Sequence, residues 1–358
     1  MLTEAEIRQR FIEGYEFPPL RICLAEADKS LGRNAELDAI LAIELEGESF
    51  DFAAEFKSRS IPKVFEQGLA QIGSLAERLQ KLPLLVVPYL RESQLQELQQ
   101  RQLSGIDLCG NGVVIIPGKA FVYRTGAKNQ FPDSTPTKFA YRGATSQVAR
   151  VFLCQRQFES LKDIEATMKK RGGEVVLSTI SKALKRLDSD LIIDRSGDAI
   201  RLLQPEKLLE SLAKSYVAPK IRKQVSLSFR SNEKNLSRVA KLAAGLGNKQ
   251  KVAPSYVLTG KSSIVRYAVM GREEVVEVYT ENLDSLAKQL GDSVEKNTRF
   301  VDLVLYETID PTVYFDRRLI SGIPYASPIQ SYLECSAGDK REIEVADQIK
   351  TRILDELK

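Results

Sequence analysis

The chain contains no histidine, and it has only four cysteines among its 358 residues. Without histidine, Ser-His-Asp hydrolysis, Cys-His proteolysis, histidine-ligated zinc chemistry and HNH-type nuclease chemistry are excluded. The cysteines are far apart and form no C-x-x-C pair, so neither a zinc site nor a disulfide framework is indicated. Any catalysis must therefore run on Asp, Glu, Lys and a hard metal ion.

Long apolar runs are also missing. No run approaches the ~20 residues that a membrane span requires. The polar, acidic start Met1-Leu-Thr-Glu-Ala-Glu6 is unlike a secretory signal. We therefore expect a cytoplasmic protein with no membrane segment. The length allows two or three domains, each with its own core.

The stretch 37–57 reads as two β-strands that turn at Gly47. Asp38 stands at the start of the first strand, and Glu55-x-Lys57 stands at the end of the second. Because strand residues alternate faces, Glu55 and Lys57 should point the same way. Asp38 enters from the neighbouring strand, so Asp38 and Glu55 are candidate ligands of an all-oxygen Mg²⁺ site.

Such a site can cleave phosphodiesters, because the metal ion polarises the phosphate and lowers the pKa of a bound water, while Lys57 orients the nucleophile or stabilises developing charge. The pattern resembles the PD-(D/E)XK, or restriction-endonuclease-like, nuclease superfamily, in which such a hairpin is followed by a helix. The resemblance implies a Mg²⁺-dependent endonuclease with Asp38, Glu55 and Lys57 as catalytic residues. The family's proline before the first acid is missing, since Leu37 stands there. The alternative is that charged residues merely end a strand.

Helical spacing of apolar residues predicts a helix over 61–82, directly after the hairpin. Gln67 and Gln71 lie one turn apart on it, near where some branches of the superfamily carry an extra glutamine, so Gln71 joins the candidate catalytic residues. Asp107, in an I-D-L-x-G-N segment, is either a further polar contributor or a turn residue at the end of a strand.

Around these elements we expect a helix near the N-terminus, a second amphipathic segment over 20–31, and alternating strands and helices up to residue 123. This order predicts a nuclease-like α/β domain over 1–128. The stretch from Gly126 to Ala144 is rich in Gly, Pro, Ser, Thr and Lys, and we interpret 129–144 as a linker.

Residues 145–217 predict three helices and a β-hairpin, which resembles a winged helix-turn-helix. Ser178 can cap the third helix, and an apolar stripe marks its buried face. If the resemblance holds, this helix enters the major groove of DNA and the hairpin approaches phosphates. The candidate DNA contacts here are Ser178, Thr179, Lys182, Lys185, Arg186, Arg195 and Arg201. Winged helices also mediate protein contacts, and the nearby acids Asp188, Asp190, Asp194 and Asp198 would repel DNA unless they turn away.

Between Ala218 and Lys251 there are nine basic residues and one acid, a surplus of eight that exceeds the net charge of +4 for the whole chain. We interpret 218–252 as a basic connector, and Lys220, Arg222 and Lys223 as further phosphate contacts whose binding falls steeply with salt. A solvated, lysine-rich connector is the alternative.

Residues 253–358 predict an α/β domain that ends in an amphipathic helix, with Ile343, Ala346, Ile349, Ile353 and Leu357 inside. A Leu-Thr-Gly strand and turn, a later E-V-Y strand, an S-x-I-Q-x-Y-L segment and a final R-E-x-E-x-A helix resemble the C-terminal region of abortive-infection antitoxins from type IV toxin-antitoxin systems. Those proteins place a winged helix before a minimal nucleotidyltransferase-like domain. Gly260 and Ser262 fit the turn of a nucleotidyltransferase, but Glu277-Val-Tyr279 offers one acid where paired aspartates are needed, which implies a non-catalytic relative.

The sequence therefore predicts a restriction-endonuclease-like domain, a winged helix and a small nucleotidyltransferase-like domain. The main functional interpretation is a protein of phage defence, restriction or toxin-antitoxin function that binds double-stranded DNA and cuts it with Mg²⁺. The rival is a transcriptional regulator or antitoxin that uses the nuclease fold as a binding platform, and a pure protein-interaction module is a third possibility. A toxin or defence-system protein and a second copy of the chain are the expected protein partners.

Overall fold

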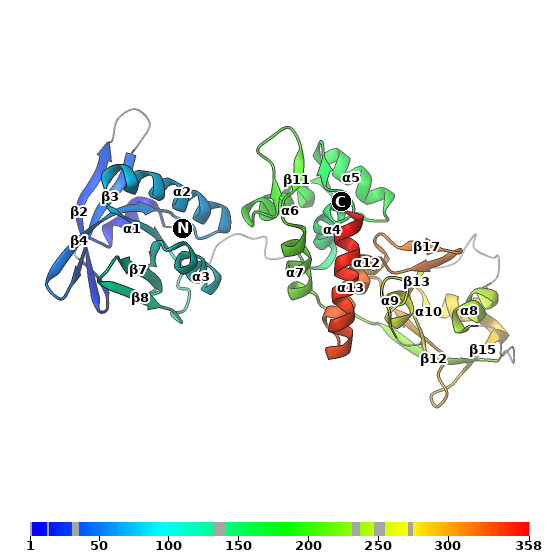
Figure 1. Cartoon of the computed structure of the whole chain (residues 1–358). Helices are drawn as coiled ribbons and strands as arrows, with labels where there is room; N and C mark the ends of the chain where they lie inside the picture. Colours follow the sequence, from blue (N-terminus) through cyan, green and yellow to red (C-terminus); the bar gives the residue numbers. More distant parts are fainter. Residues whose placement is uncertain are drawn as a thin grey trace. The chain divides into compact units, whose positions relative to one another are not determined.

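The computed structural model describes residues 2–12, 14–30, 36–131, 140–230, 237–246, 255–270 and 275–357. The chain forms two compact units, Met1–Pro136 and Thr137–Lys358, which are considered separately (Figure 1). Both mix helices with β-sheet, as expected. Within the described ranges, no helix has both the length and the apolar character to cross a membrane.

The first unit is built on an eight-stranded sheet whose strands lie in sequence order. Strands β1 to β4 are antiparallel, β4, β5 and β6 are parallel, and β7 and β8 return antiparallel. Its elements are α1 (Glu4–Gln9), β1 (Tyr15–Phe17), β2 (Leu20–Ser30), β3 (Glu36–Leu45), β4 (Glu48–Phe56), α2 (Pro62–Leu79), β5 (Leu82–Val87), α3 (Glu92–Arg101), β6 (Ser104–Asp107), β7 (Gly112–Ile116) and β8 (Ala120–Arg124).

The hairpin predicted over 37–57 is confirmed as β3 and β4, and the helix after it as α2. The two residues between the strands, Glu46 and Gly47, both have positive φ (50° and 86°). Such a two-residue turn matches the twist of an antiparallel pair. The amphipathic segment 20–31 is an eleven-residue strand, β2, which pairs along β3 with a bulge between Leu24 and Glu26.

Helices cover both faces of this sheet. Ile7 of α1 and Phe11 pack on one face with Phe52 and Phe56 of β4, whereas α2 and α3 bury their apolar stripes on the other face. Burial on both faces explains the continuous apolar run of β5. The end of β4 is therefore enclosed from both sides, which matters for the charged residues that stand there.

The second unit begins with a helical part that carries a small sheet. The three-stranded sheet has the order β10-β11-β9 and antiparallel pairing. The elements of this part are α4 (Ser146–Phe152), β9 (Gln157–Phe158), α5 (Leu161–Lys170), α6 (Leu177–Ser189), β10 (Ile193–Asp194), β11 (Ile200–Leu202) and α7 (Pro205–Ser215). Ser178 does not cap α6, because the helix begins one residue earlier, at Leu177, with Val176 as its N-cap.

The rest of the second unit is a seven-stranded sheet with the order β15-β12-β16-β14-β13-β18-β17 and with helices packed against it. The elements are β12 (Lys223–Phe229), α8 (Arg238–Leu246), β13 (Tyr256–Thr259), α9 (Lys261–Ile264), β14 (Val276–Thr280), α10 (Leu283–Leu290), β15 (Val294–Lys296), β16 (Leu303–Glu307), α11 (Pro311–Tyr314), β17 (Arg318–Ile320), β18 (Ile323–Tyr325), α12 (Pro328–Ser336) and α13 (Lys340–Glu356).

Within 218–252, residues 223–229 and 238–246 form a strand and a helix of the sheet part rather than a connector. Strand β12 pairs with both β15 and β16, and α8 packs into the same core. Val225, Leu227 and Phe229 recur at every second residue of β12 and contact this core, whereas Lys223, on the same face at the start of the strand, is exposed. Residues 231–236 and 247–252 of this segment, and 132–139 of the expected linker, lie outside the described residues.

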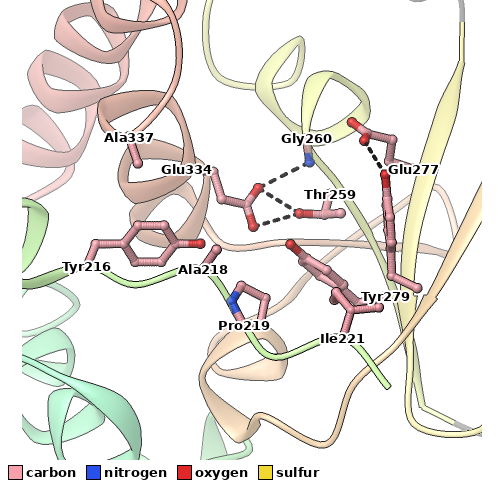
Figure 2. Close-up of a pocket in the computed structure, with 11 residues that line it drawn as sticks. Tyr216, Ala218, Pro219, Ile221, Thr259, Gly260, Glu277, Tyr279, Glu334 and Ala337 are labelled. Atoms are coloured by element: carbon pink, nitrogen blue, oxygen red, sulfur yellow. Dashed lines mark hydrogen bonds between the residues drawn. The ribbon is translucent and has the colours of Figure 1, made fainter. Parts of the chain in front are cut away.

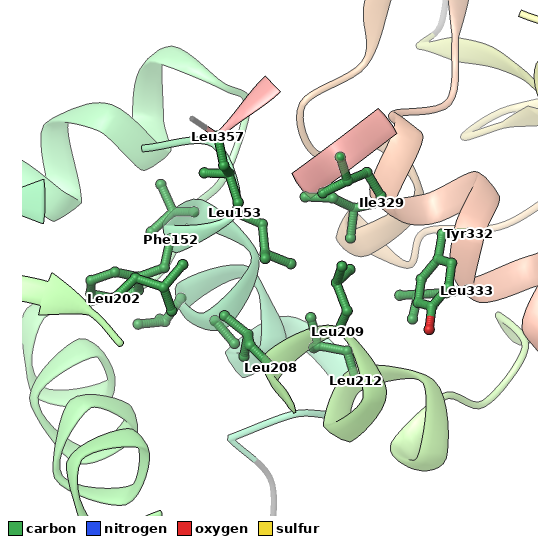
Figure 3. Close-up of a cluster of buried hydrophobic side chains, with 14 of the residues drawn as sticks. Phe152, Leu153, Leu202, Leu208, Leu209, Leu212, Ile329, Tyr332, Leu333 and Leu357 are labelled. Carbon is green, nitrogen blue, oxygen red and sulfur yellow. The ribbon is translucent and has the colours of Figure 1, made fainter. Parts of the chain in front are cut away.

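The helical part shares one hydrophobic core with α12 and α13 of the rest of the second unit. Phe152 of α4 and Leu208 and Leu212 of α7 belong to the same buried cluster as Ile329 and Leu333 of α12 (Figure 3). Helix α13 adds its apolar stripe to this cluster.

The prediction that Ile343 belongs to the buried stripe of α13 is wrong. The Ile343 side chain is 49% exposed, and Val345 occupies the buried position instead. The buried positions 345, 346, 349 and 353 recur at helical spacing.

Candidate functional site

The ends of β3 and β4 bring two carboxylates together. The ladder pairs Ala39 with Ala54, so the next residues outward, Asp38 and Glu55, face each other across the two strands. Oδ2 of Asp38 accepts a hydrogen bond from the backbone N–H of Phe56 at 2.8 Å. This bond continues the β-ladder with a side chain, and it holds the Asp38 carboxylate at the end of β4.

Glu55 is only 4% exposed, and its partner is Lys57. The Nζ atom of Lys57 donates to Oε1 of Glu55 at 2.5 Å. Burial raises the pKa of the Glu55 carboxyl, the hydrogen bond from Lys57 opposes that rise, and the negative charge of Asp38 adds to it. The two carboxylates stand opposite each other across the strands, so their charges repel.

Helix α2 closes over this pair. A Cβ on Gly68 would lie 2.6 Å from a methyl group of Leu85 and 3.3 Å from Cγ of Lys57, so the absence of a side chain lets the helix approach the lysine. Gln71 lies one turn further along α2 and is exposed. No hydrogen bond among the described residues joins Gln71 to Asp38, Glu55 or Lys57.

The donor set fits a small, hard cation. Mg²⁺ is commonly bound through one or two carboxylates, with water and substrate phosphate completing its shell. Asp38 and Glu55 supply two carboxylates at one point, and the electrostatic strain on buried Glu55 is of the kind that a divalent ion would relieve. Within the described ranges, no cluster of three or more acidic or cysteine side chains is arranged to hold a metal ion.

Asp107 has a structural role. It is fully buried, and its carboxylate accepts hydrogen bonds from the backbone N–H groups of Leu90, Cys109 and Asn111 and from the Asn111 side chain, at 2.7 to 2.8 Å. These bonds close the turn after β6 and the loop after β5. These hydrogen bonds support the interpretation of Asp107 as a turn residue.

The residues of α6 that the sequence singled out differ in exposure and in their partners. The stripe of Ile180, Ala183, Leu184 and Leu187 is fully buried, as predicted. Ser178, Lys182 and Lys185 are exposed and Thr179 is half-buried. The Arg186 guanidinium is bound by the Asp190 carboxylate at 2.8 Å, and the Tyr141 hydroxyl donates to the same carboxylate. Asp190 is therefore turned inward, and Arg186 is held with it.

The remaining basic candidates lie on two separate parts of the second unit. Arg195 is half-buried in the turn between β10 and β11, and Arg201 on β11 is exposed and donates to the Gln157 side chain at 3.1 Å. Lys220 and Arg222 are exposed just before β12, whereas Lys223 on that strand pairs with Asp284 at 2.7 Å.

A pocket that sequence reasoning missed lies in the second unit. It is centred on Glu334 of α12, whose carboxylate accepts hydrogen bonds from the Thr259 hydroxyl, the Gly260 N–H and the Gln330 side chain at 2.7 to 3.1 Å (Figure 2). Tyr216, directly after α7, also lines it. Sequence patterns singled out Gly260 and Glu277, which also line this pocket, but not Glu334 or Tyr216, because residues so far apart in the chain meet only after folding.

Glu277 is the acid that the sequence singled out on β14. It accepts a hydrogen bond from the Tyr306 hydroxyl at 3.1 Å. At Gly260 φ is +54°, a conformation that favours glycine, and a Cβ there would lie 2.0 Å from Oε2 of Glu277 and force that carboxylate to shift. A second acid does stand near Glu277, but it comes from α12 rather than from β14. Comparison of the chain with protein-family models, with curated proteins and with solved structures found no match.

Proposed function

We propose that this protein binds double-stranded DNA and hydrolyses its phosphodiester bonds with Mg²⁺ at the site formed by Asp38, Glu55 and Lys57. The observation that carries the proposal is the convergence of these side chains at the end of the β3–β4 hairpin. Glu55 is buried, Lys57 contacts it at 2.5 Å, and Asp38 is close enough to influence its pKa. The resemblance to the PD-(D/E)XK superfamily supports the same chemistry, and the order of hairpin, helix and strand agrees with it.

Each side chain has a distinct role in this proposal. Asp38 and Glu55 hold the cation, which, when bound, polarises the phosphate and lowers the pKa of a coordinated water. Lys57 then leaves its pairing with Glu55, orients the nucleophilic water and stabilises the negative charge that develops on the phosphate. Gln71 on α2 is a candidate for positioning the same water or a phosphate oxygen.

The second unit is proposed to bring the DNA to this site. Helices α4, α5 and α6 with the sheet β10-β11-β9 resemble a winged helix-turn-helix, in which α6 would enter the major groove. Exposed Lys182 and Lys185 support that role. The inward turn of Asp190 supports it as well, because it removes one of the acids that would repel DNA.

The alternative is a transcriptional regulator or antitoxin without catalytic activity. The short pairing of Lys57 with Glu55 favours it, because an ion pair that stays closed leaves neither group free for the reaction. In this reading the first unit is a binding platform, and the second unit contacts DNA and a toxin or defence-system protein. Both readings predict DNA binding, but only the first predicts strand scission that requires Mg²⁺.

A plasmid-nicking assay decides between them. Wild-type protein is expected to nick supercoiled plasmid in Mg²⁺ and to be inactive with chelator, and Lys57→Ala should remove the nicking. Lys81→Ala is the matched control, since Lys81 pairs with Asp51 of β4, the strand that also carries Glu55. Equal nicking by wild type and Lys57→Ala would remove the assigned site, and an inactive wild type that still binds DNA would favour the regulator.

A further inference from the structure

The pocket in the second unit is a defined cavity with about 300 Å³ of accessible space. The lining residues come from the segment after α7, from β13, β14 and β16, and from α12; they are Tyr216, Ala218, Pro219, Ile221, Thr259, Gly260, Glu277, Tyr279, Tyr306, Glu334 and Ala337. A cavity of this size lies at the lower end of the range for small-molecule sites.

The lining is acidic and contains neither lysine nor arginine among its described residues. Among the described residues, the donors that orient Glu334 are neutral: the Thr259 hydroxyl, the Gly260 N–H and the Gln330 amide. Neutral donors order a carboxylate without cancelling its charge. Glu277 is likewise held by a neutral group, the hydroxyl of Tyr306.

One positive charge lies behind the pocket wall. Arg150 of α4 is buried, and its Nη1 donates to Oε1 of Gln330 at 2.9 Å, while Nε2 of Gln330 donates to Glu334 at 2.8 Å. Arg150 therefore offsets part of the charge of Glu334 through one intervening side chain. The carboxylate of Glu277, bound to Tyr306, is the stronger counter-charge for a ligand in the pocket.

The other chemical feature of the pocket is its three tyrosines. The rings of Tyr279 and Tyr306 pack with centroids 5.9 Å apart at an interplanar angle of 50°. Tyr216 lies on the other side, and in Figure 2 its hydroxyl and that of Tyr279 point toward the space below Glu334. Aromatic faces attract cations, and phenol oxygens accept hydrogen bonds from them.

We propose that this pocket binds an organic cation, an alkylguanidinium or alkylammonium group, with Glu277 and Glu334 as counter-charges and Tyr216, Tyr279 and Tyr306 as its aromatic wall. The group can belong to a free small molecule or to an arginine or lysine side chain of a partner protein. Phosphate-bearing ligands are disfavoured, because they would meet two carboxylates and no basic side chain of the lining. This inference is independent of the nuclease site, since it concerns residues of the other unit.

Titration calorimetry on the full-length chain tests the proposal with two probes: agmatine for a free cation, and N-acetylarginine amide for a protein side chain. Wild type is expected to bind at least one of them, and Glu277→Gln should weaken that binding by about tenfold or more. Glu281→Gln is the matched control, because Glu281 is exposed just after β14 and does not line the pocket. Binding of agmatine alone would identify a free cation, and binding of both would identify a side-chain site as well.

Two results would overturn the proposal. One is no binding of either probe up to about 10 mM, where millimolar affinity would be detected. The other is equal affinity in Glu277→Gln and wild type. Because Gln preserves the shape of Glu277 and an acceptor for the Tyr306 hydroxyl, the variant should fold, and its thermal unfolding next to that of Glu281→Gln verifies this.

Discussion

The Nζ atom of Lys57 lies 2.5 Å from Oε1 of Glu55, at the point where β4 ends beneath α2. Glu55 is nearly inaccessible, with 4% of its surface exposed, so this pairing compensates a charge that has lost its water. Asp38 adds a second negative charge nearby. A divalent cation could take over the compensating role of the lysine and free it for chemistry, which is the relationship on which the proposed activity depends.

As the pH is lowered, Mg²⁺ binding should begin to weaken at a higher pH than it would if Glu55 had the pKa of an ordinary glutamate. Burial raises the pKa of Glu55 above its usual 4.5, and a protonated carboxyl is a poor ligand for Mg²⁺. The Mg²⁺ concentration for half-maximal nicking should therefore rise as the pH falls through that raised pKa. Nicking measured over a matrix of pH and Mg²⁺ checks this. A requirement that stays constant down to the usual glutamate range would contradict it.

Lys182 and Lys185 should each contribute to DNA affinity through phosphate contacts. Replacing either by alanine should weaken binding of a duplex across all sequences and reduce the slope of log K against log salt by roughly one. Fluorescence anisotropy at several salt concentrations measures both effects. Lys288→Ala, an exposed lysine on α10, is the control. If all three variants behave alike, α6 is not the contacting helix.

Gly260→Ala should destabilise the second unit by roughly 2–4 kcal/mol. The estimate combines the cost of a left-handed conformation with the cost of overpacking, since the new Cβ would lie 2.0 Å from Oε2 of Glu277. Chemical denaturation measures the change. Gly197→Ala serves as the control, because a Cβ there meets nothing within 4 Å. A Gly260→Ala variant as stable as wild type would show that Glu277 can move aside.

Arg150→Met should cost about 3 kcal/mol of stability, in the range for leaving two buried, neutral acceptors without a donor. The arginine joins α4 to the Thr312 carbonyl at 3.0 Å and to Gln330 at 2.9 Å, and both acceptors would lose their donor. The exposed Arg156, replaced by Met in the same way, should change stability little. Denaturant unfolding of the two variants makes the comparison, and equal stability would contradict the bridging role of Arg150.

The stability of the second unit should rise as the pH falls through the pKa of Glu334. Burial raises this pKa above the usual 4.5, so the folded state binds the proton more tightly than the unfolded chain does in the window between the two values. Glu334→Gln cannot gain this proton, and its stability should depend less on pH there. Urea unfolding at several pH values checks the difference, and parallel curves for the two proteins would contradict the prediction.

Local patterns predicted the elements that hold the candidate nuclease site. The hairpin, its turn at Gly47 and helix α2 follow from alternation, turn chemistry and helical spacing, which are properties of neighbouring residues. The same patterns failed where tertiary pairing decided the outcome. The basic residues around β12 resembled a solvated connector, but the strand pairs on both edges and packs against the core.

The pocket around Glu334 in the second unit was not predicted, for a related reason. Glu334 reaches Thr259 across 75 residues of sequence, and Tyr216 joins them from a third segment. No spacing rule connects such residues, and only the packing of α12 against the end of β13 brings them together. The predicted cap at Ser178 is wrong, because the N-cap of α6 is Val176, two residues before it.

The most direct test of the central claim is Mg²⁺-dependent scission of plasmid DNA by wild type, Glu55→Gln and Glu48→Gln. Glu48 pairs with Lys119 in the same unit and is not part of the site, so its variant controls for the loss of a carboxylate. We expect wild type and Glu48→Gln to cut with Mg²⁺, and Glu55→Gln to bind DNA without cutting it. Scission by Glu55→Gln at the wild-type rate, or its persistence in chelator, would contradict the account.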